Sequence, residues 1–339
     1  MSRRLAVSLS NEVPISETVA LVRRAEELGY SEVWVPESRH GRSGTTVAAV
    51  LARETSRIDL CVGAINPFWR HPSLIAMEVA TLDEACGGRL RIALGAGLWT
   101  LRALGEDDDR TRRPLAAMVE AIRVVKAVLA GEEGVDGEIF RVRDDAKLDF
   151  QPIRRQVPVY VGAVNRLMIR ATGAWADGVY LGAITSPGYA RWACGEMAAG
   201  AEKAGRDPSS LDVVANVLLS VGPDRRAARD ACRRVLAYYL YRVEPVVYEQ
   251  SGADPEQVEF VRSSVPEHGV DWVAEHLPED LIDIFAAAGD PDTVMSRLDD
   301  FERAGVRGLN AWYVFGPDPD EGLRLLARAA GQLRGNSDG

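Results

Sequence analysis

Short apolar segments alternate with amphipathic stretches along most of the chain. One unit recurs: an amphipathic helix pattern, a glycine or turn, a short apolar run, and then small residues. Clear copies place helices at residues 16–28, 47–55, 74–86, 167–175 and 293–304. Strands that are apolar on both faces and alternate with helices are typical of a parallel sheet covered on both sides. The pattern therefore predicts an α/β protein.

The number of apolar runs selects the architecture. Eight runs are centred near residues 7, 34, 60, 92, 159, 180, 215 and 312. Eight strands with helices between them predict a (β/α)8 TIM barrel, whose catalytic residues lie at the carboxyl ends of the strands. A doubly wound open sheet is the alternative. Its dinucleotide fingerprint is poor, because Gly95-Ala96-Gly97-Leu98-Trp99-Thr100 lacks the third glycine.

Two stretches interrupt the alternation. Residues 131–156 are charged and rich in turn residues, and 138–142 with 147–150 predict a hairpin. Residues 223–290 are mostly helical and lie between the seventh and eighth strands. The helices expected there cover residues 227–240, 245–250, 255–262 and 277–288. We expect one barrel domain over residues 1–334, with this helical insertion, and a flexible tail at 335–339.

Composition excludes several classes of function. The net charge of −10 argues against a general nucleic-acid binder. No apolar run approaches the roughly 20 residues of a membrane span, and no secretory signal precedes the first strand pattern, so a cytoplasmic protein is expected. The four histidines show no metal-ligand spacing, which predicts no metal site. The cysteines are far apart along the chain and are expected to be free thiols.

Most residues that follow the predicted strands are small, and few are ionisable. This rim suits a bound cofactor that supplies the chemistry. The candidate cofactor-binding residues are Gly63, Ala64, Ile65, Asn66, Gly95, Ala96, Gly97, Gly162, Ala163, Val164, Asn165, Gly182 and Ala183. Residues 162–165 and 182–183 each precede a predicted helix, and the amide groups at a helix amino terminus favour phosphate. The same residues are also compatible with ordinary turns. Glu37 and His40 are the candidate acid–base residues, and each is also compatible with a solvated loop.

Several motifs stand out by their order and spacing. They are Ala25-Glu26-Glu27-Leu28-Gly29-Tyr30 with Val33-Trp34-Val35-Pro36-Glu37, Gly63-Ala64-Ile65-Asn66-Pro67-Phe68-Trp69-Arg70-His71-Pro72, Ala80-Thr81-Leu82-Asp83-Glu84 with Gly88-Arg89, Gly95-Ala96-Gly97, and Pro158-Val159-Tyr160-Val161-Gly162-Ala163 with Ala176-Asp177-Gly178. Together they resemble the bacterial luciferase-like superfamily over about residues 4–330. Within it, the chain is most similar to the F420-dependent methylenetetrahydromethanopterin reductases and their relatives.

The resemblance implies a TIM barrel that binds coenzyme F420, or a flavin, at the carboxyl ends of the strands. A bulge with a non-prolyl cis peptide supports the cofactor ring in this family and maps to Gly63-Ala64-Ile65. Asn66 matches an asparagine beside the ring. Gly162, Ala163 and Asn165, with Gly182 and Ala183, match the loops that hold the cofactor phosphate and side chain. Residues 95–97 match another loop at the same rim. Members are usually dimers, so the resemblance also implies a homodimer.

Two departures bear on the substrate. The reductases tend to carry a glutamate at the end of the first strand, where this chain has Ser8. Their acid–histidine pair after the second strand is here Glu37-Ser38, with His40 displaced. We therefore expect an F420-dependent oxidoreductase that transfers a hydride to or from a different small organic substrate. The alternatives are an FMN-dependent monooxygenase that uses reduced flavin and O2, and a non-catalytic flavin-binding homologue. An anionic cofactor tail needs local cations, and Arg70 and Arg166 are the obvious ones near strand ends.

Overall fold

Eight parallel strands close into a barrel in the computed structural model of the chain. The structure describes residues 4–37, 40–98, 101, 105, 111–145, 147–182, 184–312 and 315–331. The barrel strands are β1 (Arg4–Ser8), β2 (Glu32–Val35), β3 (Asp59–Ile65), β4 (Leu90–Leu94), β7 (Val159–Ala163), β8 (Gly178–Leu181), β9 (Asp212–Val221) and β11 (Gly308–Trp312). They pair in this order, and β11 pairs with β1 to close the sheet. The predicted barrel is confirmed, and the open sheet is excluded.

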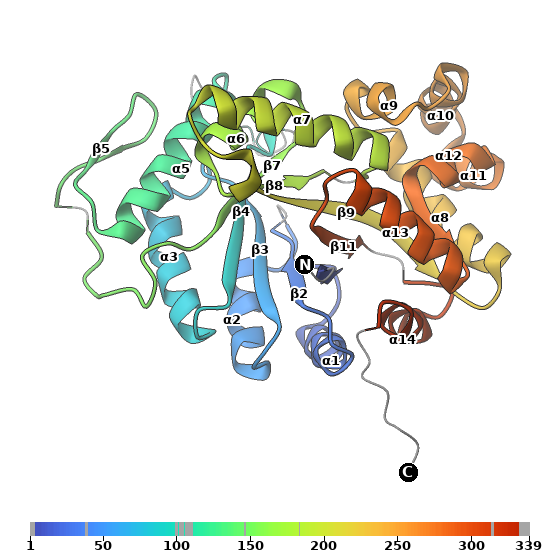
Figure 1. Cartoon of the computed structure of the whole chain (residues 1–339), viewed down its shortest axis with the longest axis horizontal. Coiled ribbons are helices and arrows are strands. Elements are labelled where there is room, and N and C mark those ends of the chain that lie inside the picture. Colours follow the sequence, from blue (N-terminus) through green and yellow to red (C-terminus); the bar gives the residue numbers. More distant parts are fainter. Residues whose placement is uncertain are drawn as a thin grey trace, which may run out of the picture.

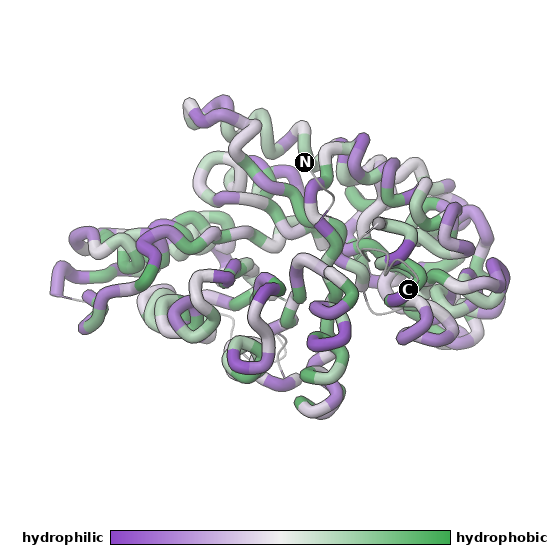
Figure 2. The backbone as a smooth tube through the Cα atoms, turned by 60° about the horizontal axis from the view of Figure 1, so that its bottom comes forward, coloured by the Kyte–Doolittle hydropathy of each residue, from purple (hydrophilic) through white to green (hydrophobic). Residues whose placement is uncertain are grey.

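Helices surround the barrel as its outer layer (Figure 1). They are α1 (Ile15–Glu27), α2 (Gly44–Glu54), α3 (Pro72–Ala85), α5 (Pro114–Ala130), α6 (Arg166–Trp175), α7 (Pro187–Lys203), α13 (Pro291–Arg303) and α14 (Pro319–Ala329), with a 3-10 turn, η1 (Pro208–Ser210). Hydrophobic and hydrophilic positions alternate along these helices (Figure 2), as one-sided packing on the barrel requires. Several begin with a capping side chain followed by proline, as at Ser186-Pro187 and Asp290-Pro291. No helix of the described ranges is long and apolar enough to cross a membrane.

The helical insertion follows β9, as expected, and forms a separate lobe at one side of the barrel (Figure 1). It contains α8 (Arg225–Leu240), α9 (Pro245–Ser251), α10 (Pro255–His268), α11 (Val270–His276) and α12 (Glu279–Phe285). The single helix predicted over 277–288 is wrong, because α12 is followed by a strand, β10 (Ala286–Gly289). This strand pairs in parallel with Leu218–Val221, the part of β9 that extends past the barrel. Alanine has little preference for strands, so these residues form a strand because the edge of β9 is available for pairing.

The predicted hairpin over 138–142 and 147–150 is also wrong in its pairing. The antiparallel pair is β5 (Val135–Asp136) with β6 (Arg141–Val142), and 147–150 forms no strand. The four-residue connection begins at Gly137, which follows Asp136, and an Asp-Gly step favours a tight turn. The carboxylate of Glu120 on α5 accepts backbone N–H groups of Glu138, Ile139 and Phe140 at 3.0, 2.7 and 2.8 Å. These bonds bind the turn to the barrel and fix its register.

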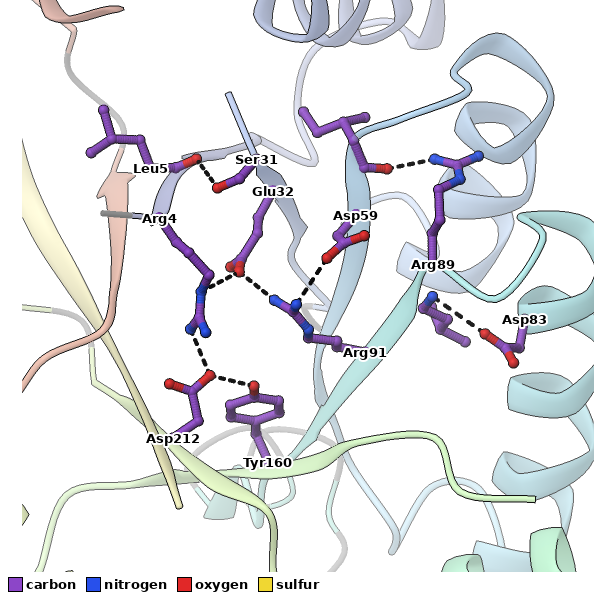
Figure 3. A network of polar contacts seen from close by, with 12 residues as sticks. Arg4, Leu5, Ser31, Glu32, Asp59, Asp83, Arg89, Arg91, Tyr160 and Asp212 are labelled. Atoms are coloured by element: carbon purple, nitrogen blue, oxygen red, sulfur yellow. Dashed lines mark hydrogen bonds and ion pairs between the residues drawn. The ribbon is translucent and has the colours of Figure 1, made fainter. Parts of the chain in front are cut away.

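A buried ionic network closes the amino-terminal end of the barrel (Figure 3). The carboxylate of Glu32 is fully buried between Arg4, at 2.7 Å, and Arg91. Arg4 also contacts Asp212 at 2.5 Å, and Arg91 contacts Asp59 at 2.8 Å. Two arginines thus pair with three carboxylates at this end of the barrel, and the five residues come from the beginnings of four strands and from β4. This network lies at the opposite end from the expected site.

Candidate functional site

The loops predicted to hold a cofactor lie side by side. Strand β3 pairs with β4, β4 with β7, and β7 with β8, all in parallel. Their carboxyl ends therefore meet along one side of the barrel mouth. The residues brought together there are Gly63, Ala64, Ile65, Asn66, Gly95, Ala96, Gly97, Gly162, Ala163, Val164, Asn165 and Gly182. Ala183, the remaining predicted residue, lies outside the described residues.

Gly63 and Ala64 form a support at the barrel mouth, which we call the shelf. The peptide bond between Gly63 and Ala64 is cis, and the β3–β4 register shifts between Val62 and Ile65. The cis peptide and bulge predicted at residues 63–65 are thus confirmed. A Cβ atom on Gly95 would lie 2.7 Å from the Cβ atom of Ala64, and one on Gly162 would lie 3.3 Å from it. Only glycine at position 95 lets β4 approach the shelf this closely.

Large side chains fill the barrel directly beneath the shelf. The inner cluster contains Trp34, Tyr160 and Cys61, with Ala64 and Tyr180 packed against it. The rings of Trp34 and Tyr180 stack at 4.2 Å, and Tyr160 meets Trp34 edge-on at 6.1 Å. Burial raises the pKa of the Cys61 thiol well above its usual value, so this group is a packing residue and not a nucleophile. The shelf therefore rests on a filled core.

Asn66 connects the β3 and β4 loops. Its side chain is buried, and its Nδ2 atom donates to the backbone carbonyl of Ala96 at 2.8 Å. Its Oδ1 atom accepts the N–H of Phe68 at 2.8 Å. A Cβ atom on Gly97, whose φ is +49°, would lie 2.9 Å from Nδ2. Asn66 is thus at the predicted place, where its amide holds two loops of the site together, and its contact with a cofactor ring stays a prediction.

Glu37 lies at the end of β2 with both carboxylate oxygens engaged. Oε2 accepts the backbone N–H of Gly44, the first residue of α2, at 2.5 Å, and Oε1 accepts from Arg70 at 3.0 Å. Arg70 also pairs with Glu78 of α3 at 2.9 Å. Burial raises the pKa of Glu78, Arg70 opposes this effect, and the charge of Glu37 adds to it. This chain of charges connects the ends of β2 and β3 with α2 and α3.

His40, the second predicted acid–base residue, is exposed in the turn that follows β2. The two residues between Glu37 and His40 lie outside the described part of the chain. Ser8, which ends β1, is buried at the mouth. The structure therefore places an ionisable pair after β2 and a neutral hydroxyl after β1.

The β7 and β8 loops are held by side chains of neighbouring elements. Asn165 caps α6 by accepting the N–H of Met168 at 3.0 Å. The hydroxyl of Tyr189 donates to the carbonyl of Val164 at 2.8 Å. Asn216 of β9 donates to the carbonyl of Gly182 at 2.9 Å. The backbone carbonyls of Val164 and Gly182 are thus hydrogen-bonded to side chains of neighbouring elements.

Neither arginine expected to serve an anionic cofactor tail is free. Arg166 pairs with Glu196 of α7 at 3.1 Å and lies 5.9 Å from the ring of Trp192. Arg70 pairs with Glu37 and Glu78 as described above.

The helical insertion borders a cavity of about 700 Å³ that the sequence did not reveal. Val164 and Gly182 line its barrel side, and Tyr238, Tyr239 and Arg242 line its insertion side. Tyr239 also packs on Trp312 at the end of β11, with ring centroids 4.3 Å apart. The position of the insertion in the sequence left open whether it covers a site or forms a subunit interface. The cavity and this ring contact show that the end of α8 borders the β7, β8 and β11 side of the barrel mouth.

Comparisons with known proteins agree with this geometry. Residues 1–308 match the model of the luciferase-like monooxygenase family. The chain is 32% identical over 313 residues to a 5,10-methylenetetrahydromethanopterin reductase of Archaeoglobus fulgidus, covering 91% of this chain and 92% of the relative. It is 25% identical over 317 residues to an F420-dependent glucose-6-phosphate dehydrogenase of Microbacterium testaceum, covering 89% and 88%. The structure of the F420-dependent tetrahydromethanopterin reductase of Methanopyrus kandleri superposes with a TM-score of 0.89 at 26% identity, covering 97% and 98%.

Proposed function

We propose, because the chain belongs to the luciferase-like monooxygenase family, that it is an F420-dependent oxidoreductase that transfers a hydride between the deazaflavin and a small organic substrate. Relatives that match nine tenths of the chain are named as reductases and dehydrogenases, and one name states dependence on F420. The observation that carries the proposal is the shelf at Gly63 and Ala64, with glycines at the neighbouring strand ends.

The residues at the shelf fit a planar cofactor. Among the described residues, Ala64, Gly95 and Gly162 place only a methyl group or no side chain at the ends of β3, β4 and β7. The inner cluster packs against Ala64 from inside the barrel and so fixes the position of the shelf. A flat ring can therefore rest one face on Ala64 and present the other face to a substrate.

The bound cofactor would supply the hydride chemistry, and the protein supplies orientation and proton handling. We assign the accompanying proton to the pair after β2. Glu37 is held in place by the N–H of Gly44 and by Arg70, and each of its carboxylate oxygens keeps a second lone pair that can accept a proton. His40 is exposed and can exchange a proton with water. The double substitution E37Q/H40A tests this assignment, and unchanged turnover would remove it.

The end of β1 favours a substrate other than a pterin. Ser8 stands where the reductases tend to carry a glutamate, and it is buried at the mouth. A hydroxyl can orient a substrate by one hydrogen bond but offers no carboxylate. The substrate is therefore proposed to be a small molecule that needs no acid at this position. A homodimer is proposed as the assembly, and light scattering during size-exclusion chromatography tests it.

Equilibrium titration of the apoprotein with oxidised F420 and, in parallel, with FMN tests the cofactor. Binding is measured by the quenching of the cofactor fluorescence. We expect F420 to bind with a micromolar or lower dissociation constant and FMN to bind more weakly. The reverse preference would identify the protein as a flavin-dependent monooxygenase. Binding of neither cofactor would contradict both functions.

A further inference from the structure

The side chain of the proposed cofactor is anionic, yet this chain carries a net charge of −10. A phosphate at the mouth therefore needs a nearby cation that is not already neutralised. Arg70 is bound between Glu37 and Glu78, and Arg166 is bound to Glu196. Both strand-end arginines are thus committed to carboxylates of the protein itself.

Arg242 lies in the loop between α8 and α9 and is in a different situation. It forms no ion pair with any carboxylate of the described residues. Its guanidinium lies 3.8 Å from the ring centroid of Tyr238 and donates to the carbonyl of Tyr238 at 2.7 Å. Stacking and one backbone bond hold the group in place while its remaining N–H groups stay available. Arg242 is therefore a preorganised, unneutralised cation.

The cavity connects this cation with the loops expected to hold the cofactor phosphate. Arg242 lines the same cavity of about 700 Å³ as Val164, after β7, and Gly182, after β8. The carbonyls of these two residues are already bonded, to Tyr189 and Asn216 respectively. A negatively charged group above these loops would face the cavity, whose described lining includes one cation, Arg242, and one carboxylate residue, Glu244, both on the insertion.

We propose that Arg242 binds the phosphate-bearing side chain of the cofactor, which makes the helical insertion part of the cofactor site. This inference rests on the proposed function. It assigns the insertion a role in affinity for the anionic side chain, distinct from that of the Ala64 shelf, which supports the ring. FMN also ends in a phosphate, so the shared chemistry is a phosphate on a ribityl chain.

The test compares two ligands that differ only beyond the ribityl chain: F420, and its deazaflavin core that ends in a hydroxyl. Dissociation constants are measured by fluorescence titration for the unmodified protein, Arg242→Gln, Arg242→Lys and Arg226→Gln. Arg226 is a matched control, because it carries the same charge near the other end of α8, about 21 Å from the last residue of that helix at 1.5 Å per residue.

We expect Arg242→Gln to raise the dissociation constant of F420 about tenfold, the loss of one charge-assisted contact, and to leave that of the core unchanged. Arg242→Lys should keep part of the affinity, and Arg226→Gln should have no effect. Raising the salt from about 0.1 to about 1 M should weaken F420 binding in the unmodified protein more than in Arg242→Gln, because salt screens the charge.

Equal weakening of both ligands by Arg242→Gln would overturn the inference, since it would indicate a general effect on the mouth. No effect on either ligand would overturn it as well, and the proposed function would stand. If the unmodified protein binds neither F420 nor the core, the proposed function fails. The same comparison with FMN and riboflavin then decides the inference, which requires selective loss of FMN affinity in Arg242→Gln.

Discussion

Arg70 donates to the Oε1 atom of Glu37 at 3.0 Å, which joins the loop after β3 to the end of β2. The side chain of Glu37 is only 9% exposed, and this contact and the N–H of Gly44 are its hydrogen-bond donors among the described residues. We expect Arg70→Gln to lower the free energy of unfolding by about 1–3 kcal/mol, the cost of leaving a buried acceptor without its charged partner. Urea denaturation measures this change.

The exposed Arg53 of α2 is the control for this substitution. Arg53→Gln should change the stability by less than about 0.5 kcal/mol. Equal effects of the two substitutions would mean that Arg70 contributes only general charge. Arg70→Gln should also weaken cofactor binding, because the loop that contains Asn66 begins at the same shelf.

Gly95 allows a second prediction, because a Cβ atom there would lie 2.7 Å from that of Ala64. Gly95→Ala must displace the shelf, so we expect a loss of about 1–3 kcal/mol in stability, typical of overpacking, and weaker cofactor binding. A Cβ atom on Gly195, in the middle of α7, would have no atom within 4 Å. Gly195→Ala should therefore stabilise the protein by about 0.5–1 kcal/mol and leave cofactor binding unchanged.

If the shelf is correctly identified, the two variants shift the temperature of thermal unfolding in opposite directions, and cofactor titration shows weaker binding only for Gly95→Ala. Tight cofactor binding by Gly95→Ala would show that the ring does not rest on Ala64.

The barrel could be predicted from the sequence because buried parallel strands are apolar on both faces. Residues 58–62, for example, have this character, and β3 covers Asp59–Ile65. Strand β10 could not be predicted, because Ala286, Ala287 and Ala288 have no strand preference and pair only because β9 extends beyond the barrel. Local pattern therefore identified the barrel strands, and only tertiary structure revealed the ninth strand of the sheet.

The glycines of the candidate site were predictable because each lies in the last residues of a strand or shortly after it, and parallel pairing brings strand ends together. The partners of the charged residues were not. Glu37 and Arg70 are 33 positions apart, and nothing in either segment marks the other as its partner. Arg242 lies in a helical region whose position over the mouth depends on the packing of Tyr239 against Trp312. The sequence shows the type of such residues but not their contacts.

Glu26 allows a prediction about pH. Its Oε1 atom accepts the N–H groups of Ser56, Arg57 and Ile58 at 2.9, 2.7 and 3.0 Å. Burial acts to raise the pKa of Glu26, but these bonds outweigh it, and the pKa is lowered. A lowered pKa in the folded state gives stability that is present above the unfolded value, about 4.3, and is lost as the pH falls through the folded value.

Glu26→Gln should therefore lower the free energy of unfolding by about 1 kcal/mol at pH 7, with a smaller difference from the unmodified protein below about pH 4. Its neighbour Glu27 is exposed and pairs only with Arg24, at 3.2 Å, among the described residues, so Glu27→Gln serves as the control and should have little effect. Chemical denaturation at several pH values measures both. A constant difference at all pH values would mean that the charge of Glu26 does not matter.

The ionic network at the amino-terminal end of the barrel should support the fold without affecting the cofactor site. Glu32 is fully buried between Arg4 and Arg91, whereas the side chain of Asp59, which also pairs with Arg91, is 32% exposed. Removing one partner of a buried ion pair costs about 3–5 kcal/mol, because the other charge stays buried. Glu32→Gln should cost about this much in urea denaturation, and Asp59→Asn less than about 1 kcal/mol.

Cofactor affinity separates the two ends of the barrel. The inner cluster with Trp34 and Tyr160 lies between Glu32 and the Ala64 shelf. Burial, with the charge of Asp212 adding to it, raises the pKa of Tyr160, so its phenol stays protonated and donates to Asp212 at 2.6 Å. We therefore expect Glu32→Gln, at a temperature where it is fully folded, to bind F420 with unchanged affinity. Weaker binding by a folded Glu32→Gln would show that the inner cluster transmits changes at the amino-terminal end to the shelf, and that the two ends are not independent.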